Sequence, residues 1–316
     1  MLNRRHIRVK VMHSIYAYVQ SNNDNIQVQE KFLMNSIEKI YDLYILQLLL
    51  LVELLKKAEH HSELIKKKHL ATLEDKNPND KFIKNEIINL LIDSSSLSIN
   101  KERLHLNNWS SENDNEYVNL LFQEMIESDL YKEYMSTRTS SFNEDKQFVE
   151  DLFKKIIAPN EKLYNYYEDK KLTWINDYPL VNTSVLKTIR GLKKTTDVFI
   201  LPDMYRDEEE DTQFAKDLFR KTLKYYPELQ EEIEGKTPNW DSERITLIDA
   251  ILLRMAICEL LYFSSIPVKV TINEYLEIAK EYATPKSSSF INGILDNIVK
   301  DYKSTNRLNK SGRGLM

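Results

Sequence analysis

Four cationic side chains lie within the first ten residues of this chain: Arg4, Arg5, Arg8 and Lys10. The first twenty residues contain no aspartate or glutamate that would neutralise them. Clustered positive charge attracts the phosphates of a nucleic acid, which supply the sequence-independent part of affinity. The alternative is an ordinary solvated helix start, although cations at a helix N-terminus are mildly unfavourable. As surface charges, these residues should contribute little to folding stability.

An aromatic side chain, Phe290, lies at the edge of an apolar stripe that begins at Ile291. At such an edge the ring is either partly exposed, where it can stack on a base, or packed in the core, and the sequence leaves both open. Gly293 follows in the same helical pattern, at a cost of up to about 1 kcal/mol relative to alanine. We expect close approach of another helix, rather than of a nucleic acid, to require its missing side chain.

Catalytic patterns are missing from the sequence. Glu102 and His105 have the spacing of half a di-iron site, but no other histidine has a carboxylate three residues before it. The sequence also lacks a zinc-protease motif, a dinucleotide-binding glycine pattern and a nucleophile elbow. We therefore predict a protein that is not an enzyme.

Composition predicts an all-α fold. The chain has 316 residues, of which 42% are hydrophobic, and only 5 Gly and 8 Pro, too few for the tight turns of a sheet protein. The net charge of −5 argues against nucleic-acid binding over the whole surface. The single cysteine, Cys258, excludes an internal disulfide, fits a reducing cytoplasm and is expected to be buried.

Helical periodicity covers most of the chain. The first helix has a core face with Ile7, Val11 and Ile15, and the four cations occupy its remaining surface. A long buried helix is predicted over about 28–68. A loop is expected at Ser94–Ser96. Further helices are predicted at about 81–93, 115–135, 143–157, 160–170, 182–198 and 207–226, before three packed helices between 247 and 302.

Several polar residues lie on or beside the apolar faces of this last block. We expect them to form buried pairs and caps rather than to contact a ligand, because buried polar groups need partners. They are Arg254, Glu259, Asn273, Glu274 and Asn292. Thr271 with Glu274 has the spacing of a capping box, and Thr284 before Pro285 is a good N-cap.

The same block carries strings that resemble the NusB family of bacterial transcription antitermination factors. The strings are LRMAICEL at 253–260, IPVKVTINE at 266–274, Ala279-Lys280, FINGILD at 290–296 and, at the start of the chain, RRHIR at 4–8. The resemblance covers about 1–20 and 243–302 and, less closely, the helix at 207–226. It implies a NusB-like domain formed by 1–25 and 206–302, a helical insertion at 26–205 and a flexible basic tail at 303–316.

The resemblance also implies a function and a set of site residues. NusB-like proteins are all-α, built from two helical bundles, and bind single-stranded boxA RNA as a heterodimer with the small-subunit ribosomal protein NusE. The complex makes RNA polymerase resist termination during ribosomal RNA synthesis, and no cofactor is involved. By this resemblance, phosphate contacts fall to Arg4, Arg5, Arg8 and Lys10, base stacking to Tyr16 and Phe290, and the ribosomal-protein surface to Asp249 and Glu259.

Two positions depart from the family pattern. Cys258 stands where the family often has tyrosine, and Ser289 stands before Phe290 where a basic residue is common. We expect Lys286 to compensate as an RNA contact. The alternative function is a helical protein–protein interaction module that uses the insertion and does not bind RNA. The third reading, the RNA-targeting domain of a ribosomal RNA methyltransferase, is disfavoured because no glycine-rich cofactor domain follows residue 302.

Overall fold

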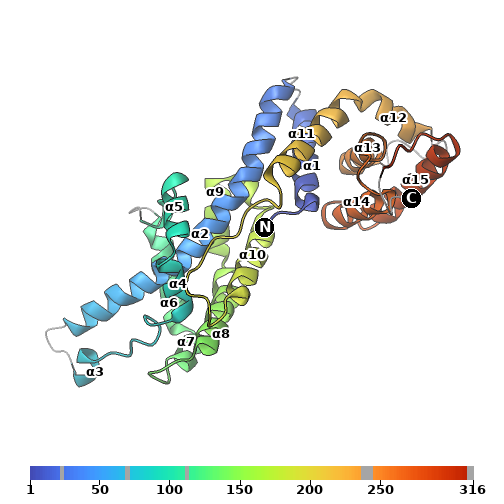
Figure 1. The fold of residues 1–316 in the computed structure, drawn as a ribbon. Coiled ribbons are helices and arrows are strands. Elements are labelled where there is room, and N and C mark those ends of the chain that lie inside the picture. Colours follow the sequence, from blue (N-terminus) through green and yellow to red (C-terminus); the bar gives the residue numbers. More distant parts are fainter. Residues whose placement is uncertain (22–24, 68–71, 111–113, 236–244, 312–316) are drawn as a thin grey trace. The chain divides into compact units, whose positions relative to one another are not determined.

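Every regular element that the structure describes is a helix, which confirms the all-α prediction (Figure 1). The chain divides into two units, which are treated separately below: unit 1 is Met1–Ile37 with Met204–Met316, and unit 2 is Glu38–Asp203. Within the described part of the chain, no helix has the length and apolar character needed to span a membrane. The computed structural model describes residues 1–21, 25–67, 72–110, 114–235 and 245–311.

Unit 1 contains the first and last helices of the chain. In Figure 1 the blue α1 belongs to this unit, as do the yellow-to-red helices from α11 onward. The helices are α1 (Arg4–Ser21), the first turns of α2 (Ile26–Lys66), α11 (Glu208–Lys224), α12 (Tyr226–Glu234), α13 (Leu247–Tyr262), α14 (Val268–Tyr282) and α15 (Ser287–Ser304).

Helix α13 is the centre of unit 1, in contact with α1, α11, α12, α14 and α15. Every residue from Ile251 to Leu260 is buried, including Cys258, as expected. A helix that is apolar on all sides must be enclosed by neighbours, which explains why five helices surround it. The helix begins where Thr246 Oγ1 accepts a hydrogen bond from the Asp249 N–H at 3.2 Å.

The C-terminal tail corrects an expectation. The sequence predicts a flexible tail from residue 303, but α15 continues to Ser304 and the next residues are anchored to unit 1. Arg307 pairs with Glu232 at 2.7 Å, and Lys310 Nζ donates to the backbone carbonyls of Glu259 (3.1 Å) and Phe263 (2.9 Å) at the end of α13. A cation is favourable there because it satisfies carbonyls left free at a helix C-terminus. Residues 312–316 of the predicted tail lie outside the described residues.

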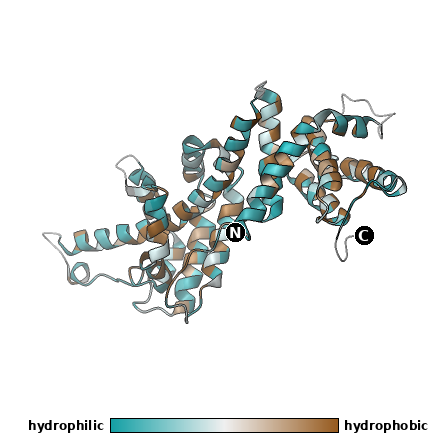
Figure 2. Ribbon diagram, turned by 45° about the horizontal axis from the view of Figure 1, so that its top comes forward, coloured by the Kyte–Doolittle hydropathy of each residue, from teal (hydrophilic) through white to brown (hydrophobic). Residues whose placement is uncertain are grey.

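Unit 2 contains the rest of α2 and the helices that follow it up to residue 191. Most of these helices carry both hydrophobic and hydrophilic stretches (Figure 2). The helices are α3 (Leu73–Lys76), α4 (Glu86–Ile92), α5 (Ser95–Arg103), α6 (Asn115–Glu127), α7 (Asp129–Tyr134), α8 (Phe142–Leu152), α9 (Glu161–Lys170) and α10 (Tyr178–Gly191), with short 3-10 or π turns η1 (Asn108–Ser110), η2 (Phe153–Ile157) and η3 (Leu172–Trp174).

The core of unit 2 forms around α2, as predicted for its most apolar stretch. All residues from Asp42 to Val52 are buried. Two tryptophan rings pack against this helix, and their indole N–H groups donate to its backbone carbonyls: Trp109 to Leu46 O at 2.9 Å and Trp174 to Lys39 O at 2.7 Å. These bonds satisfy the polar atoms of two buried aromatic rings.

A second buried polar centre joins the turn before α4 to α7 and α8. The ammonium group of Lys81, although almost fully buried, donates to Tyr134 O (2.6 Å), Thr137 Oγ1 (2.7 Å) and Glu144 Oε1 (2.5 Å). Three acceptors satisfy all three ammonium protons, so the charge is compensated inside the unit.

Serine hydroxyls explain two of the wrongly predicted boundaries. Ser94 Oγ accepts from the Leu97 N–H at 3.1 Å and starts α5, where a loop was expected. Ser128 Oγ accepts from the Tyr131 N–H at 3.1 Å, so the single helix predicted over 115–135 is divided into α6 and α7. Serine is a strong N-cap because its side chain replaces a missing helical acceptor.

The bounds of the helix predicted over 182–198 are also wrong, and α12 was not among the predicted helices. Helix α10 begins at Tyr178 and ends at Gly191. The following segment is not helical, and it buries Phe199 and Leu201. Proline is tolerated in the first helical turn, and Pro227 occupies that place in α12.

Candidate functional site

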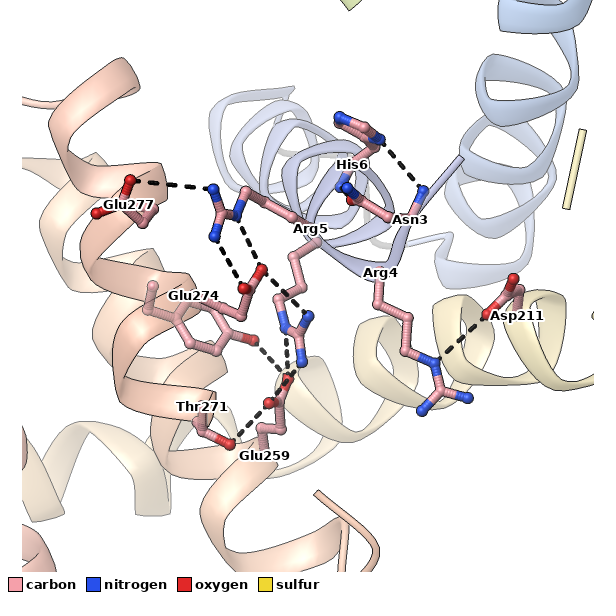
Figure 3. A network of polar contacts seen from close by, with 11 residues as sticks. Asn3, Arg4, Arg5, His6, Asp211, Glu259, Thr271, Glu274 and Glu277 are labelled. Carbon is pink, nitrogen blue, oxygen red and sulfur yellow. Dashed lines mark hydrogen bonds and ion pairs between the residues drawn. The ribbon is translucent and has the colours of Figure 1, made fainter. Parts of the chain in front are cut away.

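The first two arginines of α1 each face carboxylates on another helix of unit 1 (Figure 3). Arg4 reaches α11, where it pairs with Glu210 (2.8 Å) and Asp211 (3.4 Å). Arg5 reaches α14, where its Nε and Nη2 donate to the two carboxylate oxygens of Glu274, both at 2.9 Å. These hydrogen bonds lower the pKa of Glu274 from its ordinary value. Because each arginine side chain is 35% exposed, water or a ligand can still reach it.

The third arginine forms a buried ion pair. Arg8 donates from Nε and Nη2 to the two carboxylate oxygens of Glu259, both at 2.8 Å, and both side chains are almost completely buried. The same carboxylate accepts from Thr271 Oγ1 at 2.8 Å and Tyr275 OH at 3.3 Å. Burial disfavours the charge of Arg8, but the bonds to Glu259 and its attraction offset this, so the pKa of Arg8 is raised.

The phenyl ring of Phe214 completes this network. The guanidinium groups of Arg4 and Arg8 both lie 5.1 Å from the ring centroid, within range of a cation–π interaction. Sequence reasoning missed Phe214 and the acidic partners on α11. The acidic run that begins this helix has a sufficient local explanation, because negative charge is favourable at a helix N-terminus. The second role of these carboxylates, pairing with Arg4, becomes visible only in the structure, where α1 packs against α11.

The predicted exposure of Arg8 and Lys10 is therefore wrong, because both residues are buried. Arg8 lines the groove beside Arg4 and Arg5, but only 2% of it is exposed, and Lys10 is 4% exposed. The family-based placement of Asp249 and Glu259 on a partner surface is wrong for the same reason, since Asp249 is 3% and Glu259 0% exposed. Of the four N-terminal cations, Arg4 and Arg5 alone keep partly open side chains.

The expectation that polar residues on the apolar faces form pairs is confirmed for Glu259, Glu274 and Arg254, but it is wrong for Asn273, which is exposed. Glu259 and Glu274 hold arginines of α1, as described above. Arg254 donates to Gln230 and lies 4.0 Å from the ring centroid of Tyr226. The predicted capping box is wrong, because α14 begins at Val268 and both Thr271 and Glu274 are engaged in the arginine network.

Tyr16 and Lys286 each lie within four residues of a contact between α1 and the C-terminal end of α14. His13 packs edge-on against Tyr282, with ring centroids 5.2 Å apart. Tyr16 follows one turn later on α1 and is 39% exposed. Lys286, which is exposed, follows Tyr282 by four residues, and Phe290 lies one turn into α15 and is half-buried. Helix α15 begins at Ser287, two residues after Pro285. The prediction that Thr284 is its N-cap is therefore wrong.

The predicted site residues that keep exposed surface therefore fall into two groups in unit 1: Arg4 and Arg5 form the first, and Tyr16, Lys286 and Phe290 the second. Glu274, which holds Arg5, and Tyr282, which contacts His13, are eight residues apart on α14, a rise of about 12 Å. A groove of about 450 Å³ lies beside the first group, and Asn3, Arg4, Arg5 and Pro267 are among its lining residues.

Gly293 lies on the open side of α15. A Cβ atom at this position would meet no atom of the described chain within 4 Å. The expectation that another helix of this protein requires the missing side chain is therefore wrong. Gly293, three residues after Phe290, therefore leaves space on the surface of α15 that a side chain would fill.

Comparison with known proteins identifies residues 185–300 as matching the model of the NusB family. This span includes α11 to α15 and reaches back into α10, but it does not include α1. It contains the carboxylates that hold Arg4, Arg5 and Arg8, together with Lys286 and Phe290. No solved structure matches the chain at a significant level.

Three curated relatives, each named transcription antitermination protein NusB, are similar to part of the chain. The protein of Salinibacter ruber is 50% identical over 111 residues, which cover 35% of this chain and 69% of the relative. That of Chloroherpeton thalassium is 39% identical over 117 residues (37% and 56%), and that of Dictyoglomus turgidum is 47% identical over 96 residues (30% and 66%). Identity of this degree over more than two thirds of the Salinibacter protein shows that the chain belongs to the NusB family.

Proposed function

We propose that this chain is a transcription antitermination factor that binds boxA-type single-stranded RNA with the small-subunit ribosomal protein NusE. The proposal rests on the family match over residues 185–300. It places the protein in the cytoplasm, within a complex that acts on RNA polymerase during ribosomal RNA synthesis. It requires no cofactor and no catalytic residue.

The RNA surface we propose consists of partly or fully exposed side chains in the two groups of unit 1. Phosphates are bound by Arg4 and Arg5 beside the groove and by Lys286 at the start of α15. Bases stack on Tyr16 and Phe290, since an aromatic face accepts any base. Arg8 contributes from inside the unit by fixing α1, since the ion pairs of Arg5 and Arg8 join this helix to α14 and α13.

Pairing with carboxylates gives Arg4 and Arg5 a specific role. Each arginine is held in place before RNA arrives, so less side-chain entropy is lost on binding. The same carboxylates weaken the local positive field, which makes sequence-independent binding of the isolated protein weak. A partner protein that supplies further contacts then raises affinity, consistent with action as a heterodimer.

Unit 2 is, in this proposal, a helical insertion that does not form the RNA surface. The test compares Phe290→Ala with the double variant Lys66→Ala/Lys67→Ala at the C-terminal end of α2. The two lysines are exposed in unit 2 and outside the residues matched by the family model. Binding of a boxA-like oligonucleotide is measured by fluorescence anisotropy at fixed salt, with and without NusE.

Phe290→Ala should weaken binding by about 1–3 kcal/mol, the usual contribution of one stacking aromatic, while the lysine variant should bind as the parent does. Three phosphate contacts predict a log–log salt slope of about −2. Loss of binding at the lysines with retention at Phe290 would place the active surface in unit 2 and favour the protein-interaction alternative. A salt slope near zero would show that no phosphate is contacted and would exclude the proposed RNA binding.

A further inference from the structure

A second groove of unit 1 lies between the first turns of α2 and the C-terminal half of α11. It has a volume of about 660 Å³, and its lining is mostly apolar. Ile26 and Met34 line it from α2, with Ile26 39% exposed. Arg220 and Lys224 line it from α11. None of these residues belongs to the proposed RNA surface.

The charges around this groove do not cancel. Arg220 and Glu30 neutralise one another through a two-pronged ion pair, in which Nη2 and Oε1 are 2.7 Å apart. Lys31 and Lys224 also line the groove and are exposed. Neither lysine forms an ion pair with any residue that the structure describes. Two positive charges thus remain on the edge of an apolar surface.

We infer that this groove binds an acidic amphipathic helix of a protein partner. A volume of this size accommodates several apolar side chains, as expected when the apolar face of a helix docks into a groove. Met34 suits such a surface because its unbranched side chain adapts to different anchors. Carboxylates beside the anchors of the bound helix would pair with Lys31 and Lys224, which gives the complex its charge complementarity.

The lining argues against nucleic acid as the occupant. As far as the structure describes it, the groove presents no aromatic side chain on which a base can stack. The site is therefore distinct in its chemistry from the RNA surface, and it stands or falls independently of the proposed function.

The test uses the full chain and three labelled model peptides of sixteen residues. One is an amphipathic helix with leucine at positions i, i+3, i+4 and i+7 and glutamate elsewhere on the exposed face. The second has lysine in place of glutamate, and the third has the composition of the first in scrambled order. Fluorescence anisotropy should show binding of the acidic amphipathic peptide, with weaker binding of the other two and a decrease in affinity as salt rises.

Charge reversal locates the binding surface. The variant Lys31→Glu/Lys224→Glu should bind the acidic peptide about tenfold more weakly, because two attractive surface pairs become repulsive. Met34→Asp should also weaken binding by placing a charge on the apolar floor. The matched control is Lys216→Glu/Lys300→Glu, which makes the same charge change at positions that do not line the groove, and it should bind as the parent does.

Other results would overturn the inference. Equal binding of the lysine peptide would show that charge plays no part in recognition. An equal loss of affinity in the control variant would reduce the effect to general electrostatics. Sedimentation measurements in which Met34→Asp converts a dimer to a monomer would make a second copy of this chain the occupant. Unchanged binding in both groove variants, with melting temperatures close to that of the parent, would exclude the groove.

Discussion

Arg8 and Glu259 are 251 residues apart in the sequence and form a two-pronged ion pair with both nitrogen–oxygen distances at 2.8 Å. The pair joins the first helix of the chain to α13, the centre of unit 1. Two further donors, Thr271 and Tyr275 on α14, bind the same carboxylate. One buried carboxylate therefore holds three helices together.

Removing one member of this pair should destabilise unit 1 strongly. Glu259→Leu removes both carboxylate hydrogen bonds of the buried Arg8 and leaves it only the longer ion pair with Glu274 at 3.9 Å, so it should lower the free energy of unfolding by about 3–5 kcal/mol. The double variant Arg8→Met/Glu259→Leu should recover part of this loss, since no lone charge remains. Urea unfolding followed by circular dichroism measures both. A double variant less stable than Glu259→Leu alone would contradict this account.

RNA binding and folding should respond differently to the N-terminal arginines. Arg4→Ala/Arg5→Ala should weaken binding of a boxA-like oligonucleotide severely and change the melting temperature little, because partly exposed ion pairs contribute little to stability. Adding Arg8→Ala should lower the melting temperature markedly, contrary to the expectation from sequence. Anisotropy and thermal unfolding on the same samples separate the effects. If the Arg4/Arg5 variant retains full affinity, these residues are not phosphate contacts.

Substitution at Gly293 tests whether the open side of α15 is reserved for a partner. Gly293→Ala should stabilise the protein by up to about 1 kcal/mol, because alanine favours the helix and its Cβ meets no described neighbour within 4 Å. Replacement by a bulkier residue, Gly293→Leu, should fold normally but weaken RNA binding if the strand passes close to this surface beside Phe290. A destabilised Gly293→Ala protein would reveal a close contact inside the chain.

Stability should fall between pH 7.5 and 5.5 because of two histidines of α1. Burial lowers the pKa of His6 and of His13 from 6.5 to about 4, and nearby positive charge is the second, smaller cause. The unfolded chain binds these protons below pH 6.5 whereas the folded protein does not, so acidification favours unfolding. Each histidine should account for about 1 kcal/mol over this range.

His13→Phe keeps an aromatic ring against Tyr282 and should remove its share of the pH dependence. His60→Asn, at an exposed position on α2, is the control and should leave the pH profile unchanged. Urea unfolding at the two pH values measures the difference. Identical pH dependence in His13→Phe and the parent would show that His13 is not held neutral by burial.

Sequence alone determined the all-α class, the long buried helix and the three C-terminal helices, because composition and apolar spacing are local properties that survive in any packing. It also indicated the family, since strings such as FINGILD at 290–296 depend only on residue order. The buried state of Cys258 followed from its place on an apolar stripe. These features needed no knowledge of which helices meet.

Tertiary structure decided the roles of the polar residues. Arg4 and Arg8 have similar surroundings in the sequence, but Arg4 stays partly exposed while Arg8 enters the core, where Glu259 compensates its charge. Thr271 and Glu274 fit a capping box by spacing, yet bind Glu259 and Arg5 because α14 begins three residues before Thr271. Partners hundreds of residues apart leave no local signal. Desolvation and pairing become known only when the helices that carry the charges are packed together.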